Sequence, residues 1–398
     1  MLKIFNGKII TPNGIIDNGA LLIKDGVIHT VVQGNPEVDG AEEIDAGGQY
    51  VSAGFIDLHV HGGGGHDFMD NTVEAFLGVA ATHVKYGTTS MYPTTLSSTK
   101  QDILDTIATY QLAMDKNVDG SQFLGLHLEG PYFAMSQRGA QDPKYIRNPD
   151  PEEYEDILAD NKVVKRWSAA PELDGAIEFA RYLLSKNILP ALAHTDAVYD
   201  EVLEGYNNGY TLATHLYSGM SGVTRRNAYR YAGVVESAFL IDGMSVEVIG
   251  DGIHLPAPLL KLIYKIKGAG KIALITDAMR AAGMPPGDSI LGGLKNGLKV
   301  IVEDGVAKLP DRTAFAGSVT TADCLVRNMV NIAGVTIAEA VKMITETPAE
   351  IMGVSDRKGS LVIGKDADVV IFNDNIEIET TIIKGKVIYQ SVHTSEKL

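Results

Sequence analysis

Residues 54–62 read Gly54-Phe55-Ile56-Asp57-Leu58-His59-Val60-His61-Gly62, and they carry the strongest signal for the architecture of the chain. A short, largely apolar run bounded by glycines is typical of a strand buried on both faces, as in a parallel sheet. Because side chains alternate along a strand, His59 and His61 point to the same side. The run therefore predicts a parallel strand whose C-terminal end presents two imidazoles that can bind one ion.

Seven further apolar runs of similar length follow, and helix-length amphipathic stretches separate them. The runs, counting the first, are 55–61, 88–93, 123–128, 165–169, 189–193, 210–214, 245–249 and 272–276. Helical stretches between them include 72–86, 100–115, 174–186 and 259–267. Strands alternating with helices indicate an α/β protein with a parallel sheet, and eight strands are the number that a closed (β/α)8 TIM-like barrel needs.

The two ends of the chain have a different residue pattern, typical of short antiparallel strands. The first 50 residues read as short alternating strands broken by the turn sequences Asn6-Gly7, Pro12-Asn13-Gly14 and Lys24-Asp25-Gly26. Runs rich in β-branched residues return at 367–372 and 381–388. We therefore expect residues 1–50 and 355–398 to form a small accessory β-sandwich and residues 51–354 to form the barrel.

Composition excludes several classes of protein. The chain has 398 residues, of which 45% are hydrophobic and 21% charged, so it is neither a disordered tail nor a small scaffold. Its net charge of -16 argues against a protein that mainly binds nucleic acid or anionic lipid. The single cysteine, Cys324, permits no intramolecular disulfide and no thiolate metal site. A transition metal would have to be held by histidines and carboxylates.

Targeting signals are not evident in the sequence. The N-terminal residues lack a long apolar segment followed by a small-residue cleavage site. No stretch approaches the roughly 18 to 20 apolar residues of a membrane span. We expect a cytoplasmic protein with neither a nucleic acid nor a membrane as partner.

Metal-binding residue types follow several of the predicted strands, where the C-terminal ends of barrel strands meet. The candidate ligands are His59, His61, Glu129, His194 and His215, and Asp277 is a further carboxylate. Imidazole and carboxylate donors without sulfur suit Zn, Fe, Mn or Co, and an open coordination position indicates a catalytic site. Such an ion lowers the pKa of water and polarises a carbonyl. Asp277 is the candidate carrier of the proton from that water to a leaving nitrogen.

The remaining histidines differ in their position relative to the predicted strands. A single histidine at a strand end is more often a satisfied polar residue than a ligand, but His254 also lies at the predicted top of the barrel. His29, His83 and His393 have no such placement, and His66 follows a run of four glycines in a loop without a phosphate-binding pattern. His127 shares a strand face with Glu129, and support of the metal site or simple packing would explain it equally well.

Five motifs together resemble the amidohydrolase superfamily and, within it, the family of N-acetylglucosamine-6-phosphate deacetylases. They are residues 54–62, His127-Leu128-Glu129-Gly130-Pro131, Asp251-Gly252-Ile253-His254, Thr276-Asp277-Ala278 and Gly364-Lys365-Asp366-Ala367-Asp368. The resemblance covers nearly the whole chain. It implies a hydrolase of amino-sugar catabolism that cleaves the acetamide of N-acetylglucosamine 6-phosphate to acetate and glucosamine 6-phosphate.

The resemblance also implies a metal site. Glu129, His194 and His215 would hold one divalent cation, and His59 and His61 would help to hold a second that only some members of the family have. Zinc is the first expectation, with iron, manganese or cobalt as alternatives and one or two ions per subunit. The carbamylated lysine of many superfamily members has no counterpart at the end of the fourth strand, because Lys165 lies too early.

Substrate contacts implied by the resemblance are Ala140, Gln141, Ser218, Gly219, Arg226, His254, Phe315, Ala316 and Gly317. His254 and Arg226, with Arg225 beside it, would hold the phosphate, and a neighbouring subunit of a homodimer would lend the arginine. A solvated loop is the simpler interpretation of Arg225 and Arg226. The sequence departs from the family at Gln141, at Ser218-Gly219 and in a longer arginine loop. These departures lie where the sugar would be held and leave the reaction type unaffected.

Three alternatives stay open at this stage. The substrate could be N-acetylgalactosamine 6-phosphate. The enzyme could be another amide hydrolase of the superfamily without a phosphate requirement. The barrel could be a non-catalytic scaffold, although the presence of every candidate ligand argues against this.

Overall fold

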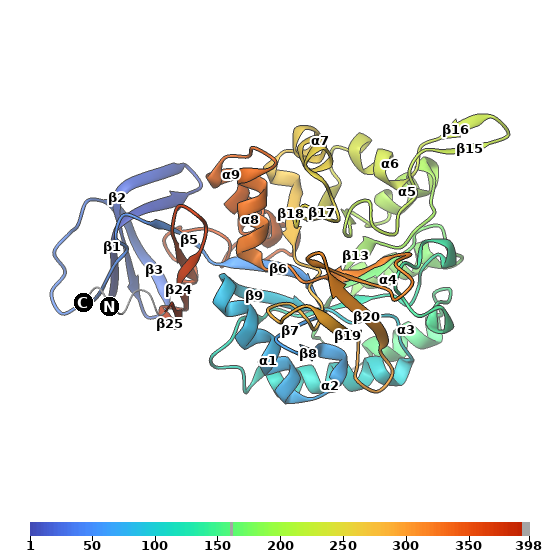
Figure 1. Cartoon of the computed structure of the whole chain (residues 1–398), viewed down its shortest axis with the longest axis horizontal. Helices are drawn as coiled ribbons and strands as arrows, with labels where there is room; N and C mark the ends of the chain where they lie inside the picture. Colours follow the sequence, from blue (N-terminus) through green and yellow to red (C-terminus); the bar gives the residue numbers. More distant parts are fainter. Residues whose placement is uncertain (160–161, 392–398) are drawn as a thin grey trace.

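The computed structural model describes residues 1–159 and 162–391 (Figure 1). Residues 392–398, which belong to the expected accessory domain and include His393, lie outside the described residues. Strands from both ends of the chain lie side by side at one end of the molecule, and the α/β part occupies the rest. None of the helices among the described residues is long and apolar enough to cross a membrane.

The strands of the two chain ends form one sheet in the order β25-β24-β23-β5-β1-β2-β3, with β4 paired to β1. The strands are β1 (Leu2–Thr11), β2 (Gly14–Lys24), β3 (Val27–Gln33), β4 (Glu42–Asp45), β5 (Tyr50–Ala53), β23 (Val369–Phe372), β24 (Ile378–Ile383) and β25 (Lys386–Gln390). The antiparallel pair β5 and β23 joins the early strands to the late ones. Ile4, Leu21, Val51 and Ile371 belong to one buried apolar cluster of this sheet.

The predicted turn at Asn6-Gly7 is wrong, because β1 runs through it. The register between β1 and β2 shifts on both sides of Gly7, and Asn6 has a φ of 57°. These are the features of a β-bulge, in which an Asn-Gly pair supplies a left-handed residue without reversing the chain. A Cβ atom on Gly7 would lie 2.6 Å from Val51 Cγ2, so the close packing of β5 requires glycine here.

The structure confirms a strand in each of the eight predicted runs. They are β6 (Phe55–Val60), β9 (Thr88–Pro93), β11 (Leu126–Glu129), β12 (Val164–Ala169), β13 (Leu189–Leu192), β14 (Leu212–Ala213), β17 (Ser245–Ile249) and β18 (Ile272–Ile275). β9 pairs in parallel with β6 and with the short β10 (Gln122–Phe123), and the last six pair in parallel in chain order. Isolated parallel bridges connect Thr94 to His127 and Val60 to Ala278, between these two groups of strands.

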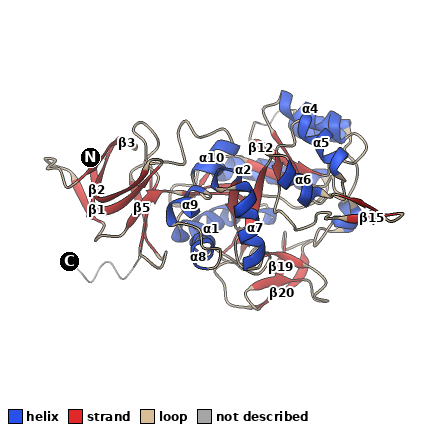
Figure 2. Ribbon diagram, turned by 90° about the horizontal axis from the view of Figure 1, so that it is seen from above, coloured by secondary structure: helices blue, strands red, loops and turns tan. Residues whose placement is uncertain are grey.

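Helices surround the parallel strands (Figure 2). They are α1 (Val73–His83), α2 (Lys100–Met114), α3 (Pro151–Leu158), α4 (Ala176–Ser185), α5 (Tyr199–Asn207), α6 (Val234–Leu240), α7 (Ala257–Lys267), α8 (Ala322–Asn331), α9 (Ile337–Lys342) and α10 (Glu346–Ile351). The Thr72 hydroxyl caps α1 by accepting a hydrogen bond from the Ala75 amide, and Thr99 caps α2 in the same way. Phe76 and Phe179 of the helices and Trp167 of β12 are fully buried in the largest apolar cluster.

Three antiparallel additions lie outside the parallel strands, and the sequence analysis does not predict them. β19 (Gly287–Leu291), β20 (Leu298–Glu303), β21 (Val306–Lys308) and β22 (Phe315–Ser318) form a four-stranded sheet. β15 (Thr224–Arg226) and β16 (Tyr229–Tyr231) form a hairpin that projects from the body of the molecule (Figure 1). The small pair β7 (Gly62–Gly63) and β8 (His66–Asp67) follows β6.

Candidate active site

A pocket of about 320 Å³ lies beyond the C-terminal ends of the parallel strands. It is lined by many of the predicted site residues, namely His61, Glu129, Ala140, Gln141, His194, His215, Ser218, Gly219, His254, Asp277, Phe315 and Gly317. The fold thus gathers side chains that are separated by up to 256 positions in the sequence, since His61 and Gly317 are both in the lining. This convergence follows from parallel strands that all end at one side of the sheet.

Glu129, at the end of β11, lies at the centre of the site. Its Oε1 atom lies 2.9 Å from His215 Nε2 and 3.2 Å from His194 Nε2. Its Oε2 atom lies 3.6 Å from His61 Nε2. The carboxylate is therefore shared by two groups of histidines, one after β13 and β14 and one at the end of β6.

The histidines of β6 face the same carboxylate from the other side. His59 Nε2 lies 3.1 Å from His61 Nε2 and 3.6 Å from Glu129 Oε1. The Asp277 Oδ1 atom, just after β18, lies 3.1 Å from His61 Nε2 and 3.5 Å from His59 Nε2. Asp277 is thus within proton-transfer distance of the region where the imidazoles converge.

Hydrogen bonds to Nδ1 orient the four imidazoles. The acceptors are the carbonyl oxygens of Gln137 for His194, Ser218 for His215 and Thr94 for His61, and the carboxylate of Glu247 for His59, at 2.8 to 3.3 Å. A neutral imidazole held in this way carries its proton on Nδ1 and turns its Nε2 lone pair toward the site. Outer hydrogen bonds of this kind are the usual means of fixing metal-binding histidines.

Three of the site residues have unusual backbone conformations. His194, His215 and Asp277 have φ values of 46°, 34° and 47°, in the left-handed region that residues other than glycine rarely occupy. Surrounding hydrogen bonds hold these conformations, such as the one from the Asp277 amide to the His59 carbonyl at 2.9 Å. Strain of this kind, held by the fold, is typical of functional sites.

Two buried residues that the sequence analysis missed support the site from below. Glu247 of β17 accepts hydrogen bonds from His59 Nδ1 and from the His215 amide, both at 3.3 Å. Arg166 of β12 is fully buried, pairs with the same carboxylate and donates to Thr214 Oγ1. The sequence does contain a sign of this pair, since Arg166 and Glu247 each lie within a predicted buried strand. A buried charge needs a partner of opposite charge, so the two could have been matched.

The charges around the site shift several pKa values. Burial acts to raise the pKa of Glu129, but the positive charge of His59 and hydrogen bonds from His194 and His215 hold it well below its usual range. Burial likewise opposes the ionisation of Asp277, yet His59 and His61 lower its pKa. Burial acts to lower the pKa of His61, whereas its hydrogen bond to Asp277 and the Glu129 charge raise it to about 9. The carboxylates are therefore ionised at neutral pH and attract positive charge.

The donor set fits a divalent cation. Two groups have donor atoms that all lie within 4.8 Å of one another, namely His59, His61 and Glu129, and Glu129, His194 and His215. Zinc bonds of about 2.0 to 2.2 Å at tetrahedral angles separate donor atoms by roughly 3.4 Å. The distances of 2.9 to 3.6 Å between Glu129 oxygens and the four Nε2 atoms lie around that value.

Comparisons with known proteins agree with this geometry. A model of the amidohydrolase family matches residues 50–388. The chain belongs to the amidohydrolase family. The resemblance identified in the sequence is therefore confirmed, and the parallel strands with their accessory sheet have the fold of that superfamily.

Individual relatives are similar over almost their full length. The N-acetylglucosamine-6-phosphate deacetylase of Bacillus subtilis (strain 168) is 34% identical over 388 residues, or 96% of each chain. The N-acetylgalactosamine-6-phosphate deacetylase of Escherichia coli O157:H7 is 32% identical over 380 residues, covering 95% of this chain and 97% of that one. The crystal structure of N-acetylglucosamine-6-phosphate deacetylase from Pasteurella multocida has a TM-score of 0.91 at 28% identity, covering 98% of this chain and all of that one.

Glycines shape the wall of this amidohydrolase pocket. Gly219 has a φ of 58°, and a Cβ atom there would lie 2.7 Å from His194 Nδ1. Gly317 has a φ of 71°, and its Cβ atom would lie 3.0 Å from the Asp277 carbonyl oxygen. Side chains at these positions would displace His194 or Asp277, so each glycine keeps a site residue in place.

His254 also lines the pocket. Its Nδ1 atom donates to Asp251 Oδ2 at 2.6 Å, and its ring lies 4.7 Å from that of Phe315. With Nδ1 engaged by Asp251, Nε2 is the nitrogen left for a ligand in the pocket. The roles predicted for His254 and Phe315 as substrate contacts stay predictions.

Three predicted site residues do not line this pocket. His59 lies beneath it and is fully buried, and Ala316 is buried in an apolar cluster with Met279 and Leu291. Arg226 is exposed on the β15–β16 hairpin, where its guanidinium lies 5.2 Å from the Tyr231 ring centroid. A contact between Arg226 and substrate in the same chain is not part of this arrangement, and its predicted role in a neighbouring subunit stays a prediction.

Two other histidines, His127 and His83, have structural partners. His127 contacts Ser168 Oγ at 2.7 Å and Thr94 Oγ1 at 3.2 Å, so it is part of the packing beneath the site. His83 Nε2 lies 2.9 Å from the Gly62 carbonyl oxygen, which it can reach as a donor. His66 lines a separate cavity of about 760 Å³.

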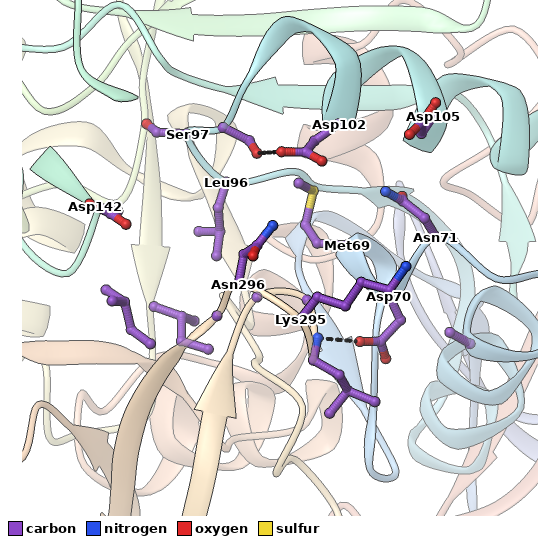
Figure 3. A pocket seen from close by; sticks show the side chains of 18 of the residues that line it. Met69, Asp70, Asn71, Leu96, Ser97, Asp102, Asp105, Asp142, Lys295 and Asn296 are labelled. Atoms are coloured by element: carbon purple, nitrogen blue, oxygen red, sulfur yellow. Dashed lines mark hydrogen bonds between the residues drawn. The ribbon is translucent and has the colours of Figure 1, made fainter. Parts of the chain in front are cut away.

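That larger cavity adjoins the active-site pocket without sharing its metal-binding groups. It is bordered by Asp70, Asn71, Asp102, Asp105, Lys295 and Asn296 (Figure 3). Leu96, Ala140, Gln141 and Leu291 line both spaces and form the wall between them. Among the described residues, both groups that can hold an ion lie at the smaller pocket, so we assign the chemistry there.

Proposed function

We propose that this chain hydrolyses the acetamide of N-acetylglucosamine 6-phosphate and releases acetate and glucosamine 6-phosphate. The observation that carries the proposal is the Glu129 carboxylate held between His194 and His215, with Asp277 and His254 in the same pocket. Relatives that bear this activity in their names match the chain over nearly its whole length, which supports the choice of substrate.

Glu129, His194 and His215 would hold the catalytic cation. When bound, a divalent cation supplies a Lewis acid that polarises the amide carbonyl and makes water more acidic. We infer zinc, because the site has only nitrogen and oxygen donors and tetrahedral spacing. The second group, with His59 and His61, offers a position for one further ion.

Asp277 would move the proton. Its carboxylate is ionised at neutral pH and accepts a proton from the attacking water. It then returns this proton to the amide nitrogen as the carbon–nitrogen bond breaks, so that the amine leaves in neutral form.

His254 would recognise the phosphate of the substrate. Asp251 orients the ring, and Nε2 can donate to a phosphate oxygen if that nitrogen carries the second proton. The exposed hairpin with Arg226 supports a homodimer in which one subunit supplies a guanidinium to the phosphate site of the other. The predicted contacts at Ala140, Gln141, Ser218, Gly219, Phe315, Ala316 and Gly317 belong to the same proposal.

The finer architectural predictions also belong here. We propose that the two groups of parallel strands close into one (β/α)8 barrel, and the bridges from Thr94 to His127 and from Val60 to Ala278 support closure. We propose residues 51–354 as the barrel domain and residues 1–50 with 355–398 as an accessory β-sandwich. The cytoplasm is the proposed location, since a sugar phosphate is too highly charged to cross a membrane unaided.

A second candidate substrate is N-acetylgalactosamine 6-phosphate. A deacetylase named for that sugar is 32% identical to this chain over 380 residues. The Bacillus subtilis relative named for the gluco epimer is 34% identical, so the two identities differ little. The two sugars differ in the orientation of one hydroxyl group. The departures at Gln141 and Ser218-Gly219 border the space where the sugar would lie.

Acetate release from three compounds tests the proposal. The zinc-loaded protein should cleave N-acetylglucosamine 6-phosphate with a higher kcat/KM than its galacto epimer. Unphosphorylated N-acetylglucosamine should react at least about a hundredfold more slowly, because it lacks charge-assisted hydrogen bonds worth about 1.5 to 3 kcal/mol each. Equal cleavage of N-acetylglucosamine 6-phosphate and N-acetylglucosamine would instead favour an amide hydrolase that does not bind the phosphate group. No acetate release from any of them would refute the proposal.

A further inference from the structure

The side chain of Gln141 is 5% exposed and has both polar atoms engaged. Its Oε1 atom accepts a hydrogen bond from the Ser97 amide at 2.8 Å, and its Nε2 atom donates to Glu129 Oε2 at 2.8 Å. A backbone N–H can only donate, so the amide oxygen of Gln141 must face Ser97 and its NH₂ group must face Glu129. The loop after β9 therefore fixes the direction of the hydrogen bond to the carboxylate.

The two oxygens of Glu129 consequently have different surroundings. Oε1 lies 2.9 Å from His215 Nε2, 3.2 Å from His194 Nε2 and 3.6 Å from His59 Nε2. Oε2 lies 3.6 Å from His61 Nε2 and accepts the Gln141 hydrogen bond. The oxygen nearest to His61 is thus the one whose electron density is drawn toward an amide.

We propose that Gln141 is a positioning residue that makes the two cation positions unequal. A hydrogen bond to a carboxylate oxygen occupies one lone pair and weakens that oxygen as a metal ligand. Gln141 therefore weakens binding at the position formed by His59, His61 and Glu129. The position formed by Glu129, His194 and His215, where the first ion binds, uses Oε1 and is left unaffected.

This inference rests on the metal site of the proposed enzyme, and it gives Gln141 a role different from the sugar contact implied by family resemblance. Gln141 acts through Glu129 and need not touch the substrate. Because the effect is on cation affinity, it can be measured without any substrate.

Zinc binding by the full-length protein tests the proposal. Metal-depleted wild type, Gln141→Leu and Gln141→Met are titrated with zinc by equilibrium dialysis and elemental analysis. Methionine keeps the length of the side chain and leucine is one atom shorter, and both remove its donor and its acceptor for the Ser97 amide. We expect the second ion to bind about tenfold more tightly in each variant, with the first ion little changed. Outer contacts alter metal affinity by about 10- to 100-fold, and the sign is a gain here because this contact draws charge away from a ligand oxygen.

The control is Gln101→Leu, which removes an exposed glutamine of α2 that donates to Asp105 far from the metal ligands. It should bind zinc as the wild type does. A ratio of the two affinities that stays at the wild-type value in both Gln141 variants would overturn the proposal. So would loss of the first, tighter ion in both folded variants, because Gln141 would then serve that position instead.

Acetate release is measured separately on the wild type. A wild type that binds zinc as described but releases no acetate would refute the proposed function and leave the role of Gln141 standing. A wild type that releases acetate while the Gln141 variants show unchanged affinities would refute the role of Gln141 alone.

Discussion

The Asp277 carboxylate lies 3.1 Å from His61 Nε2 and belongs to neither group of residues that can hold an ion. Asp277→Asn preserves its shape and removes its ability to accept a proton. We expect kcat for acetate release to fall by about 10² to 10⁴-fold, the usual contribution of a general acid–base group. Zinc content, measured by elemental analysis, should stay at the wild-type level.

Asp196→Asn is the matched control, because Asp196 is an exposed carboxylate two residues beyond His194. It should keep nearly full activity. If Asp277→Asn turned over substrate at close to the wild-type rate, Asp277 would have no part in proton transfer.

Gly219 is the residue whose replacement should disturb the metal site most directly. In Gly219→Ala the new methyl group would lie 2.7 Å from His194 Nδ1 and 2.9 Å from the Gln137 carbonyl oxygen, whose hydrogen bond to His194 it would break. We expect zinc affinity to fall by about 10- to 100-fold, as when other outer contacts of metal ligands are lost. Dialysis against buffered zinc measures this affinity.

The control separates crowding from backbone strain. Gly334 has a φ of 73°, similar to the 58° of Gly219, but no heavy atom lies within 4 Å of its Cβ position. Gly334→Ala should therefore destabilise the fold without changing zinc affinity. Equal zinc affinity in both variants and the wild type would show that Gly219 does not hold His194 in place.

At the level of elements, Lys267 connects the ends of two helices. It is the last residue of α7, and its Nζ atom donates to the carbonyl oxygens of Ala238 and Ile241 at the end of α6, at 2.9 and 3.1 Å. Burial lowers the pKa of Lys267 from 10.5 to about 8. A neutral amine still has two N–H groups, so both hydrogen bonds survive loss of the proton.

The sign of the pH dependence follows from this shift. Between pH 8 and 10.5 the unfolded chain binds this proton more strongly than the folded chain, so the contribution of Lys267 to stability rises with pH in that window. Urea unfolding midpoints of wild type and Lys267→Met should diverge in favour of the wild type as pH rises from 8 to 10. Lys265→Met, exposed on the same helix, should show a constant difference, and a constant difference for Lys267→Met would contradict the prediction.

The strands were predictable because burial on both faces leaves a continuous apolar run, whereas features that depend on a partner elsewhere in the chain were not. Asn6-Gly7 has the sequence of a turn, and only the packing of Val51 against Gly7 shows why it forms a bulge. The β19–β22 sheet was missed because its strands are short and partly exposed. Glu247 and Arg166 occupy predicted strands, but their pairing across four strands of the sheet is a tertiary fact.

Over the whole molecule, a bound cation would connect several strands of the parallel sheet. Glu129 ends β11, whereas His194 and His215 follow β13 and β14. An ion that binds only the folded chain stabilises it by about 2.7 kcal/mol at a free concentration 100 times Kd. We expect zinc-depleted protein to unfold several degrees below the zinc-loaded form in a thermal scan.

Glu129→Gln provides the control for this effect, because it weakens the one ligand common to both groups. Zinc should shift its unfolding temperature far less than that of the wild type. Identical unfolding temperatures for depleted and loaded wild type would show that no cation bridges these strands.

The convergence of the candidate metal ligands could be predicted from the sequence because each lies at or just beyond the end of a recognisable strand, and strand ends of one parallel sheet converge. The roles of the residues between the strands could not, since Gln141 reaches Glu129 only through a loop whose path the sequence does not reveal. The same reason leaves Arg226 unassigned, because its partner in the proposal belongs to another copy of the chain.

The pairing of β5 with β23 has a consequence for synthesis on the ribosome. β5 ends at Ala53 and its partner begins at Val369, so one edge of β5 stays unpaired until residue 369 has been translated. An exposed strand edge is a site of aggregation. The strands β23 to β25 therefore cover this edge late in synthesis. Nascent chains stalled before residue 369 should be the form of this protein that most needs chaperones.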